Sequence, residues 1–300
     1  MKNIAASVRD RLATKARESD QTFNEVLQYY GNERLLYRLS KSEYADNFIL
    51  KGALLFLGWG IDLRRPTRDI DFRGYELNTV EHIEEVFGRI CGITVEDDGL
   101  RFDPDSVKAE RIIEDDQYEG MRVRFQGNLG RAIIHMQVDI GFSDAVVTNP
   151  EWIDYPTLLD MPSPHIRAYP LENMIAEKFE ATVSLGLANS RLKDYYDLYV
   201  VSRIFEVDGP SLVNAIAATF GSRNTPIPDG LPGGLSDEYV DVWTSQWEAL
   251  TRRFGGNDVP AELSVVVERL RRFLLAPATG ARGHSEFKFR WKNDNWGSVG

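Results

Sequence analysis

The chain has 300 residues, of which 43% are hydrophobic, and its 35 basic and 46 acidic side chains give a net charge of -11. This length fits one large domain or two of ordinary size, and the composition excludes a disordered, collagen-like or coiled-coil chain. The acidic balance excludes a broad basic coat for nucleic acid, because neutralising phosphates requires clustered Lys and Arg. With Cys91 as its one cysteine and no long apolar stretch, the chain is expected to be cytoplasmic and to have no contact with a membrane.

Spacing of apolar residues and the position of one proline define the first part of the chain. Apolar residues three or four apart predict one or two amphipathic helices over residues 4–30 and another helix over 79–91. Residues 48–59 are apolar and small, which indicates a buried segment. Pro66 indicates that a new secondary-structure element begins after it, so residues 68–72 are predicted to form a short strand.

Two further strands are predicted before the middle of the chain. Apolar and polar residues alternate strictly over 121–126 and again over 134–140, as expected for strands that are buried on one face. The residues from Gly127 to Gly130 include two glycines and an Asn, which favours a hairpin between these strands.

The second half is predicted to be all-helical. The Pro/Gly-rich stretch 225–234 marks a loop within it. We therefore expect an α+β domain over residues 1–168 and a helical domain over 169–280. The tail over 281–300 is polar, aromatic and locally basic, which favours a solvated or disordered segment over one packed on the body. Helical spacing covers residues 171–186, 191–205, 237–252 and 260–275.

Asp69 and Asp71 form the most informative motif. Residues two apart in a strand project from one face, with Cα atoms about 6.6 Å apart, so both carboxylates could bind a Mg²⁺ ion that also contacts phosphates. Asp139 ends the polar face of the strand over 134–140 and would add the third acid of a two-metal site. The alternative for all three is a solvated carboxylate on a strand.

Lys178 and Asp194 are the candidates in the second half. Lys178 follows Met174 by four residues on the inward stripe of its helix, where a lysine either extends to water or meets an anion such as phosphate. Asp194 lies at the start of the next helix, where it either stabilises the N-terminus or orients Lys178 or a nucleotide. In the structural alternative, Lys193 and Asp197 form an i, i+4 pair.

The segment Lys51-Gly52-Ala53 precedes the acidic pair. A glycine with a small neighbour lets backbone N–H groups approach a phosphate, and the packing of a buried helix explains the same residues equally well. The sequence has no Walker A, G-x-G-x-x-G, G-x-S-x-G or H-E-x-x-H motif, and its four histidines lack metal-ligand spacing.

Five short segments between Phe48 and Phe205 occur in the order FILKGALLF, PTRDIDF, MQVDIGF, IAEKFEATV and RLKDYYDLY. Together they resemble the motifs of the AbiEii/AbiGii toxin family, nucleotidyltransferase-like proteins of toxin–antitoxin and phage-defence systems that include the MenT toxins. The resemblance implies a DNA polymerase β-type nucleotidyltransferase core with a small mixed sheet, followed by a helical domain. Many relatives have Gly-Gly or Gly-Ser after the lysine, whereas Ala53 stands here and removes a hydroxyl donor.

Carried over by position, the resemblance implies that Asp69 and Asp71 ligate Mg²⁺ and that Gly52 lines the triphosphate. Lys178 and Asp194 fill the family's later lysine and aspartate motifs and complete the predicted catalytic set. Asp139 stays the candidate for a third metal ligand. Their neighbours are also predicted to contact the nucleotide: Lys51, Ala53, Arg68 and Arg191.

We therefore predict a Mg²⁺-dependent nucleotidyltransferase toxin that transfers a nucleoside monophosphate from an NTP to RNA, with a tRNA 3′ end as the leading acceptor, and so inhibits translation. The expected protein partner is a cognate antitoxin, for which a winged-helix regulator is one candidate. Two alternatives stay open: transfer to a protein side chain, and an antitoxin's nucleotide-binding partner without turnover. Candidates for a local basic patch that docks RNA are Arg64, Arg65, Arg122, Arg124 and the tail.

Overall fold

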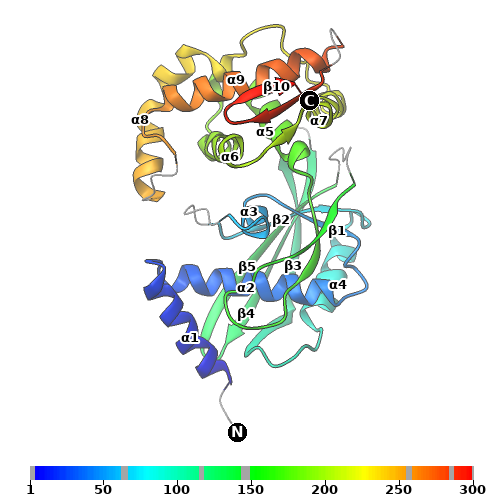
Figure 1. Ribbon diagram of the computed structural model, residues 1–300. Helices are drawn as coiled ribbons and strands as arrows, with labels where there is room; N and C mark the ends of the chain where they lie inside the picture. The colour runs from blue at the N-terminus through cyan, green and yellow to red at the C-terminus, as the bar shows by residue number, and fades with distance from the viewer. Residues whose placement is uncertain are drawn as a thin grey trace. The chain divides into compact units, whose positions relative to one another are not determined.

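The computed structural model describes residues 4–61, 67–114, 118–142, 149–254, 259–283 and 287–298, and Figure 1 shows their helices and strands. The protein is a mixed α+β chain that divides into two units. The first unit comprises residues 1–143 and 150–169, and the second comprises 144–149 and 170–300. The chain therefore passes into the second unit between Tyr169 and Pro170.

The first unit is built on a seven-stranded mixed sheet. Its strands are β1 (Phe48–Lys51), β2 (Ile70–Gly74), β3 (Leu100–Glu114), β4 (Tyr118–Leu129), β5 (Ala132–Gly141), β6 (Glu151–Asp154) and β7 (His165–Ala168). They lie in the order β3-β4-β5-β2-β1-β7-β6, in which β2 runs parallel to β5 and β1 parallel to β7. Its helices are α1 (Ile4–Glu18), α2 (Phe23–Ser40), α3 (Leu54–Gly58) and α4 (Val80–Cys91).

Local sequence explains where these elements begin and end. Thr22 and Glu25 form a capping box that starts α2, and the Thr79 hydroxyl accepts a hydrogen bond from the N–H of His82 at the start of α4. The one or two helices predicted over residues 4–30 are two, α1 and α2, and α2 continues beyond the predicted end to Ser40. The predicted helix over 79–91 is confirmed as α4. The predicted hairpin is confirmed as well, but its turn is Gly130-Arg131 rather than 127–130, because the strands pair as far as Leu129 and Ala132.

The register of the sheet separates an apolar face from a polar one. Phe48, Phe87 of α4 and Phe125 pack together on the apolar face, which also contacts α2. The strand pairing aligns one row of side chains across the other face. This row consists of Lys51, Asp71, Asp139, Arg122 and Glu110. The helices thus cover the apolar side of the strands that carry the predicted acids.

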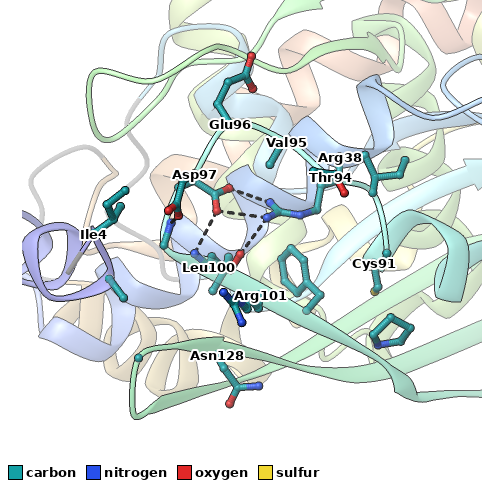
Figure 2. A pocket seen from close by; sticks show the side chains of 18 residues that line it. Ile4, Arg38, Cys91, Thr94, Val95, Glu96, Asp97, Leu100, Arg101 and Asn128 are labelled. Carbon is teal, nitrogen blue, oxygen red and sulfur yellow. Dashed lines mark hydrogen bonds and ion pairs between the residues drawn. The ribbon is translucent and has the colours of Figure 1, made fainter. Parts of the chain in front are cut away.

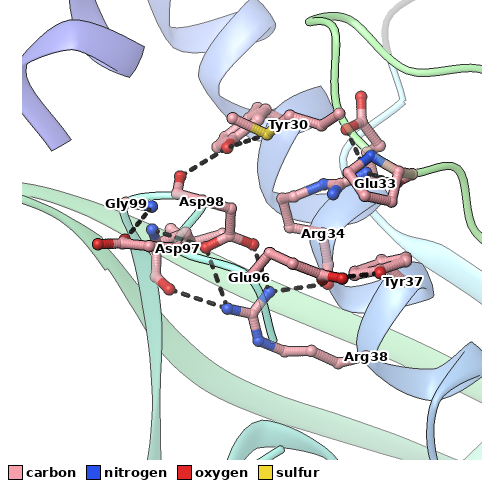
Figure 3. A network of polar contacts seen from close by, with 12 residues as sticks. Tyr30, Glu33, Arg34, Tyr37, Arg38, Glu96, Asp97, Asp98 and Gly99 are labelled. Atoms are coloured by element: carbon pink, nitrogen blue, oxygen red, sulfur yellow. Dashed lines mark hydrogen bonds and ion pairs between the residues drawn. The ribbon is translucent and has the colours of Figure 1, made fainter. Parts of the chain in front are cut away.

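Buried charges connect α2 to two loops of the first unit (Figure 3). Arg38 binds the Asp98 carboxylate at 2.8 Å, and the Tyr30 hydroxyl donates to the Asp98 carbonyl oxygen at 2.7 Å. Glu33 lies 2.7 Å from the Arg34 guanidinium, and its other carboxylate oxygen accepts the Leu158 N–H. Burial raises the pKa of Glu33 to about 7, from an ordinary value of 4.5.

Glu33→Gln should remove a pH dependence of stability that the parent shows. Because folded Glu33 keeps its proton up to about pH 7 and unfolded Glu33 loses it near 4.5, the parent's free energy of unfolding falls as pH rises through this window. Between pH 5 and 8 the variant should gain about 2.5 kcal/mol relative to the parent, at about 1.36 kcal/mol per pKa unit. Urea unfolding across this range measures it, with the exposed Glu43→Gln as control, and a constant difference for Glu33→Gln would contradict it.

The second unit is mainly helical and also contains a small sheet. Its longer helices are α5 (Leu171–Leu185), α6 (Leu192–Ile204), α7 (Gly209–Ser222), α8 (Asp237–Phe254) and α9 (Leu263–Ala281). Four of them match predicted helices, and α7 was not predicted. The all-helical prediction is wrong, because β8 (Val207–Asp208), β9 (Phe289–Lys292) and β10 (Asn295–Ser298) form a sheet in the order β10-β9-β8. None of the helices within the described ranges is long and apolar enough to cross a bilayer.

The prediction of a solvated or disordered tail is wrong for residues 289–298, which form β9 and β10. The buried Trp291 donates its indole N–H to the Ser202 carbonyl oxygen at 2.7 Å, and its ring packs against Phe273. The Arg269 guanidinium donates to both oxygens of Ser202 and to Asp294. Aromatic burial and these hydrogen bonds offset the entropy that a polar tail loses on ordering.

Trp291→Phe is expected to lower the free energy of unfolding by about 1–2 kcal/mol, because it keeps an aromatic ring but loses a buried hydrogen bond. Urea unfolding measures this loss. Trp152→Phe on β6 is the control, since that indole is exposed and its loss should change stability by less than about 0.5 kcal/mol. Equal effects of the two substitutions would show that the hairpin of β9 and β10 is not docked.

Candidate functional site

The predicted acidic pair lies where the chain enters β2. Ile70 and Phe72 are buried, whereas Asp69, Asp71 and Arg73 are partly exposed, so the alternation of faces continues back to Asp69. The strand begins at Ile70, two residues later than predicted. Asp71 therefore stands within the strand and Asp69 directly before it. The nearby Arg68 side chain is exposed, and its carbonyl oxygen accepts a hydrogen bond from Asn32.

Gly52 lies against the Asp71 carboxylate. Lys51 is paired with Asp71 across β1 and β2, and the chain then turns at Gly52 with φ +69°. A Cβ on Gly52 would overlap Asp71 Oδ2 and lie 2.8 Å from its Cγ. Only glycine combines this backbone conformation with the space that the carboxylate occupies. Ala53 follows as the buried residue before α3, and the Lys51 Nζ lies 4.7 Å from the centre of the Tyr169 ring.

Asp139 has the position that the sequence predicts, in register with Asp71 on the neighbouring parallel strand. Both of its oxygens accept hydrogen bonds from Arg122, at 2.8 and 2.7 Å. These bonds raise the pKa of Arg122, and the charge of Asp69 adds to the effect. The sequence places Arg122 on the polar face of its strand, but it does not reveal the pairing, because that depends on the register between β4 and β5.

Mg²⁺ is the metal that this type of site implies, and the donor set permits a partial test of its fit. Protein sites usually hold Mg²⁺ through one or two carboxylates and leave other positions to water and phosphate. Asp69 and Asp71 supply such oxygen donors, and the Asp71 carboxylate occupies the space that a side chain at residue 52 would fill. Both oxygens of the Asp139 carboxylate already accept hydrogen bonds from Arg122. Among the residues with described positions, no group of three His, Cys, Asp or Glu side chains could hold a metal ion. The two-carboxylate set fits, and Asp139 as a ligand stays a prediction.

The second predicted group lies between α5 and α6 in the helical unit. Met174 and Ile175 are buried as predicted, and the Lys178 ammonium group binds both Asp194 and Asp197. Its Nζ lies 3.0 Å from Asp197 Oδ2. Lys178 thus meets carboxylates, and its side chain is only 14% exposed.

Arg191 and Asp197 complete this part of the chain. Arg191 is the residue before α6, and its N–H donates to the Asn189 side chain at 2.9 Å. Helical spacing predicts Lys193 as the partner of Asp197 and does not reveal the ion pair of Asp197 with Lys178. The sequence signal was the spacing of three between Asp194 and Asp197, which places both on one side of a helix.

A separate pocket of about 700 Å³ lies in the first unit (Figure 2). It is lined by residues 91–102 together with Arg38 and residues near the turn of β4 and β5. None of the predicted site residues lines this pocket. Cys91 is part of its wall, and burial raises the pKa of this thiol to about 12, which keeps it protonated and unreactive at neutral pH.

Two solved structures are similar, JHP933 and a protein described as a candidate nucleotidyltransferase, both from Helicobacter pylori. They share 16% and 15% identity with this chain at TM-scores of 0.44 and 0.43, and each match covers 84% of this chain and 94% of the other. No curated protein matches the chain.

The family comparison covers most of the chain. The family described as nucleotidyl transferase AbiEii toxin, type IV toxin–antitoxin system, matches residues 34–274. This range contains every residue of the predicted site, from Lys51 to Asp194. The chain therefore belongs to the AbiEii nucleotidyl transferase toxin family.

Proposed function

We propose that this protein transfers a nucleoside monophosphate from an NTP to an RNA acceptor, with a tRNA 3′ end as the leading candidate, and thereby inhibits translation. The observation that supports this most directly is the geometry at Asp71, whose carboxylate fills the space left by Gly52 and lies in register with Asp139. Family membership adds the reaction class, an NTP substrate and an antitoxin partner.

The proposed chemistry divides among the chain's own residues. Asp69 and Asp71 would hold Mg²⁺, which supplies charge stabilisation to the triphosphate when bound. Lys178 is proposed to contact a phosphate oxygen, and Asp194 to orient Lys178 or the nucleotide. The acceptor hydroxyl forms a bond to the α-phosphorus and loses its proton, while the bond to the β-phosphate oxygen breaks and pyrophosphate leaves.

A transfer assay tests this proposal. The purified protein is incubated with MgCl₂, total tRNA and each α-³²P-labelled NTP in turn, and label is followed into RNA and into protein. Label in tRNA that depends on the protein is expected. Nuclease-resistant label on protein would instead select protein nucleotidylylation, and NTP binding without any labelled product would select a non-catalytic partner of the antitoxin.

Toxicity and its relief are tested separately in cells. We propose that expression of the parent arrests growth through loss of translation, that Asp71→Ala relieves the arrest, and that a cognate antitoxin, with a winged-helix regulator as the candidate, also relieves it. Equal growth arrest by parent and Asp71→Ala at matched expression would show that the toxicity does not depend on this site.

Basic side chains for RNA docking are partly neutralised in the first unit. Arg122 is bound to Asp139, and Arg124 lies 2.5 Å from Glu110. Arg64 and Arg65 lie outside the described residues. We propose that RNA docks on a local basic patch, so that its binding is modest and weakens as the salt concentration rises.

A further inference from the structure

The sheet face that carries Asp71 and Asp139 continues beyond them along β3, β4 and β5, which lie side by side in the first unit (Figure 1). Strand pairing sets further rows of side chains across these strands, each row about 6.6 Å from the last. The first row is Lys108, Arg124 and Gln137, the second is Asp103, Gln126 and His135, and Arg101 begins the third. We call these seven residues the polar strip.

The polar strip faces away from the helices that pack on this sheet. Arg124, Gln126 and His135 are exposed, whereas Phe125 is buried and packs against Phe87 of α4. Antiparallel strands commonly leave one face to water in this way. Because neighbouring strands lie about 4.8 Å apart, three strands give a strip about 10 Å wide, which suits one extended chain of nucleotides.

The charge of the polar strip is opposite to that of the whole chain. Its three basic side chains and one acidic side chain give a charge of +2, whereas the chain has a net charge of -11. On the other side of the sheet, α4 exposes Glu81 and Glu85. A ligand with a phosphate backbone is therefore attracted to the strip and repelled by the helical side.

Glu110 borders the polar strip without closing it. Its carboxylate lies 2.5 Å from Arg124, and the two side chains are 54% and 52% exposed. Exposed ion pairs contribute little to stability, because water solvates both charges, so a phosphate oxygen can bind Arg124 in place of Glu110. The side chains of Gln126, Gln137 and His135 add hydrogen-bonding groups that suit base edges and 2′-hydroxyls.

We propose that the single-stranded 3′ end of an RNA acceptor lies along the polar strip, with its phosphates bound to Arg101, Lys108 and Arg124. The strip begins one row from Asp139, so an RNA bound there has its end beside the predicted metal ligands. This inference rests on the proposed function, because it supplies the docking surface for the acceptor of that reaction. Contacts to phosphates carry no sequence information, so binding should depend weakly on the bases.

Two double variants test the location of the surface. The strip variant combines Arg101→Gln with Lys108→Gln, and the control variant combines Arg11→Gln with Lys15→Gln on α1, which packs on α2. Each variant loses two positive charges from exposed positions of the first unit. A difference between them therefore reports the position of the lost charges and not their number.

Binding of a fluorescent single-stranded RNA octamer without NTP, followed by anisotropy, measures docking independently of turnover. The strip variant should weaken binding at least fivefold, and the control variant should stay within twofold of the parent. The slope of log affinity against log salt should fall by about 1.4 in the strip variant, at about 0.7 for each phosphate contact on a single strand. A blunt RNA duplex should bind the parent more weakly than the octamer.

Kinetics show whether the bound RNA is the acceptor. In the tRNA labelling assay, the strip variant should raise the KM for tRNA at least fivefold, while kcat and the KM for NTP stay within twofold of the parent. A purely structural effect of the substitutions would instead lower kcat or raise both KM values.

Four results would overturn this proposal: no octamer binding by the folded parent, equal weakening by the two variants, tighter binding of the duplex than of the octamer, or an unchanged KM for tRNA in the strip variant. Nuclease-resistant label on protein would refute RNA as the acceptor and so the proposed function. Octamer binding would still show in that case whether the polar strip binds RNA, so the two failures are distinguishable.

Discussion

Asp71→Asn is expected to lower the rate of nucleotidyl transfer by about a thousandfold or more. The substitution keeps the size of the side chain but removes the negative charge that would hold Mg²⁺ beside Gly52. A bound metal typically contributes several kcal/mol to the stabilisation of transition-state charge, and each 1.36 kcal/mol corresponds to a factor of about ten. The rate of label transfer to tRNA at saturating NTP measures the loss.

Asp154→Asn is the matched control for this experiment. Asp154 is also a strand aspartate of the first unit and lies on β6. Its side chain is 79% exposed, and its Oδ1 lies 2.8 Å from His165 Nδ1. Its loss should leave transfer within about twofold of the parent. Substantial transfer by a folded Asp71→Asn variant would refute the role of Asp71 as a metal ligand.

Gly52→Ala should abolish transfer although it removes no charged group. Its Cβ would overlap Asp71 Oδ2, so the carboxylate must move away from its present position. The left-handed backbone adds a cost of about 1–2 kcal/mol in stability for any residue other than glycine. Transfer of label to tRNA and urea unfolding measure the two effects on the same protein preparation.

Gly60→Ala separates these two effects. Gly60 has a similar φ of +77°, and among the described residues no heavy atom outside its immediate chain neighbours lies within 4 Å of the Cβ position. This variant should therefore lose similar stability and retain transfer. If both glycine variants keep activity, the contact between Gly52 and Asp71 is irrelevant to the reaction.

Local patterns predict the elements of this fold where alternation or helical spacing is uninterrupted. The helix over 79–91 and the strands that became β4 and β5 are examples. β3 was not predicted because its register shifts between Asp103 and Lys108, which breaks the period-two pattern. Likewise, α7 begins at a Gly-Pro pair, and its first residues look like a loop until the Asp208 cap is known.

Pairings between distant residues are the part of the site that sequence could not predict. The acids and Lys178 were singled out from their types and spacing, and Asp139 was placed on the correct strand. That Arg122 binds Asp139 and that Lys178 binds Asp197 depends on strand register and on the packing of α5 against α6. The sequence shows which charged residues are present, but which of them form ion pairs depends on the fold.

The pairing of β8 with β9 has a consequence for biosynthesis. Val207 is opposite Trp291, so β8 lacks its partner strand until residue 291, 84 positions further along the chain, has left the ribosome. Domains generally fold in the order of their synthesis, and the first unit is complete by Tyr169. Premature termination before residue 289 would therefore release a protein with its acidic site built and its helical unit unfinished, a natural substrate for proteolysis.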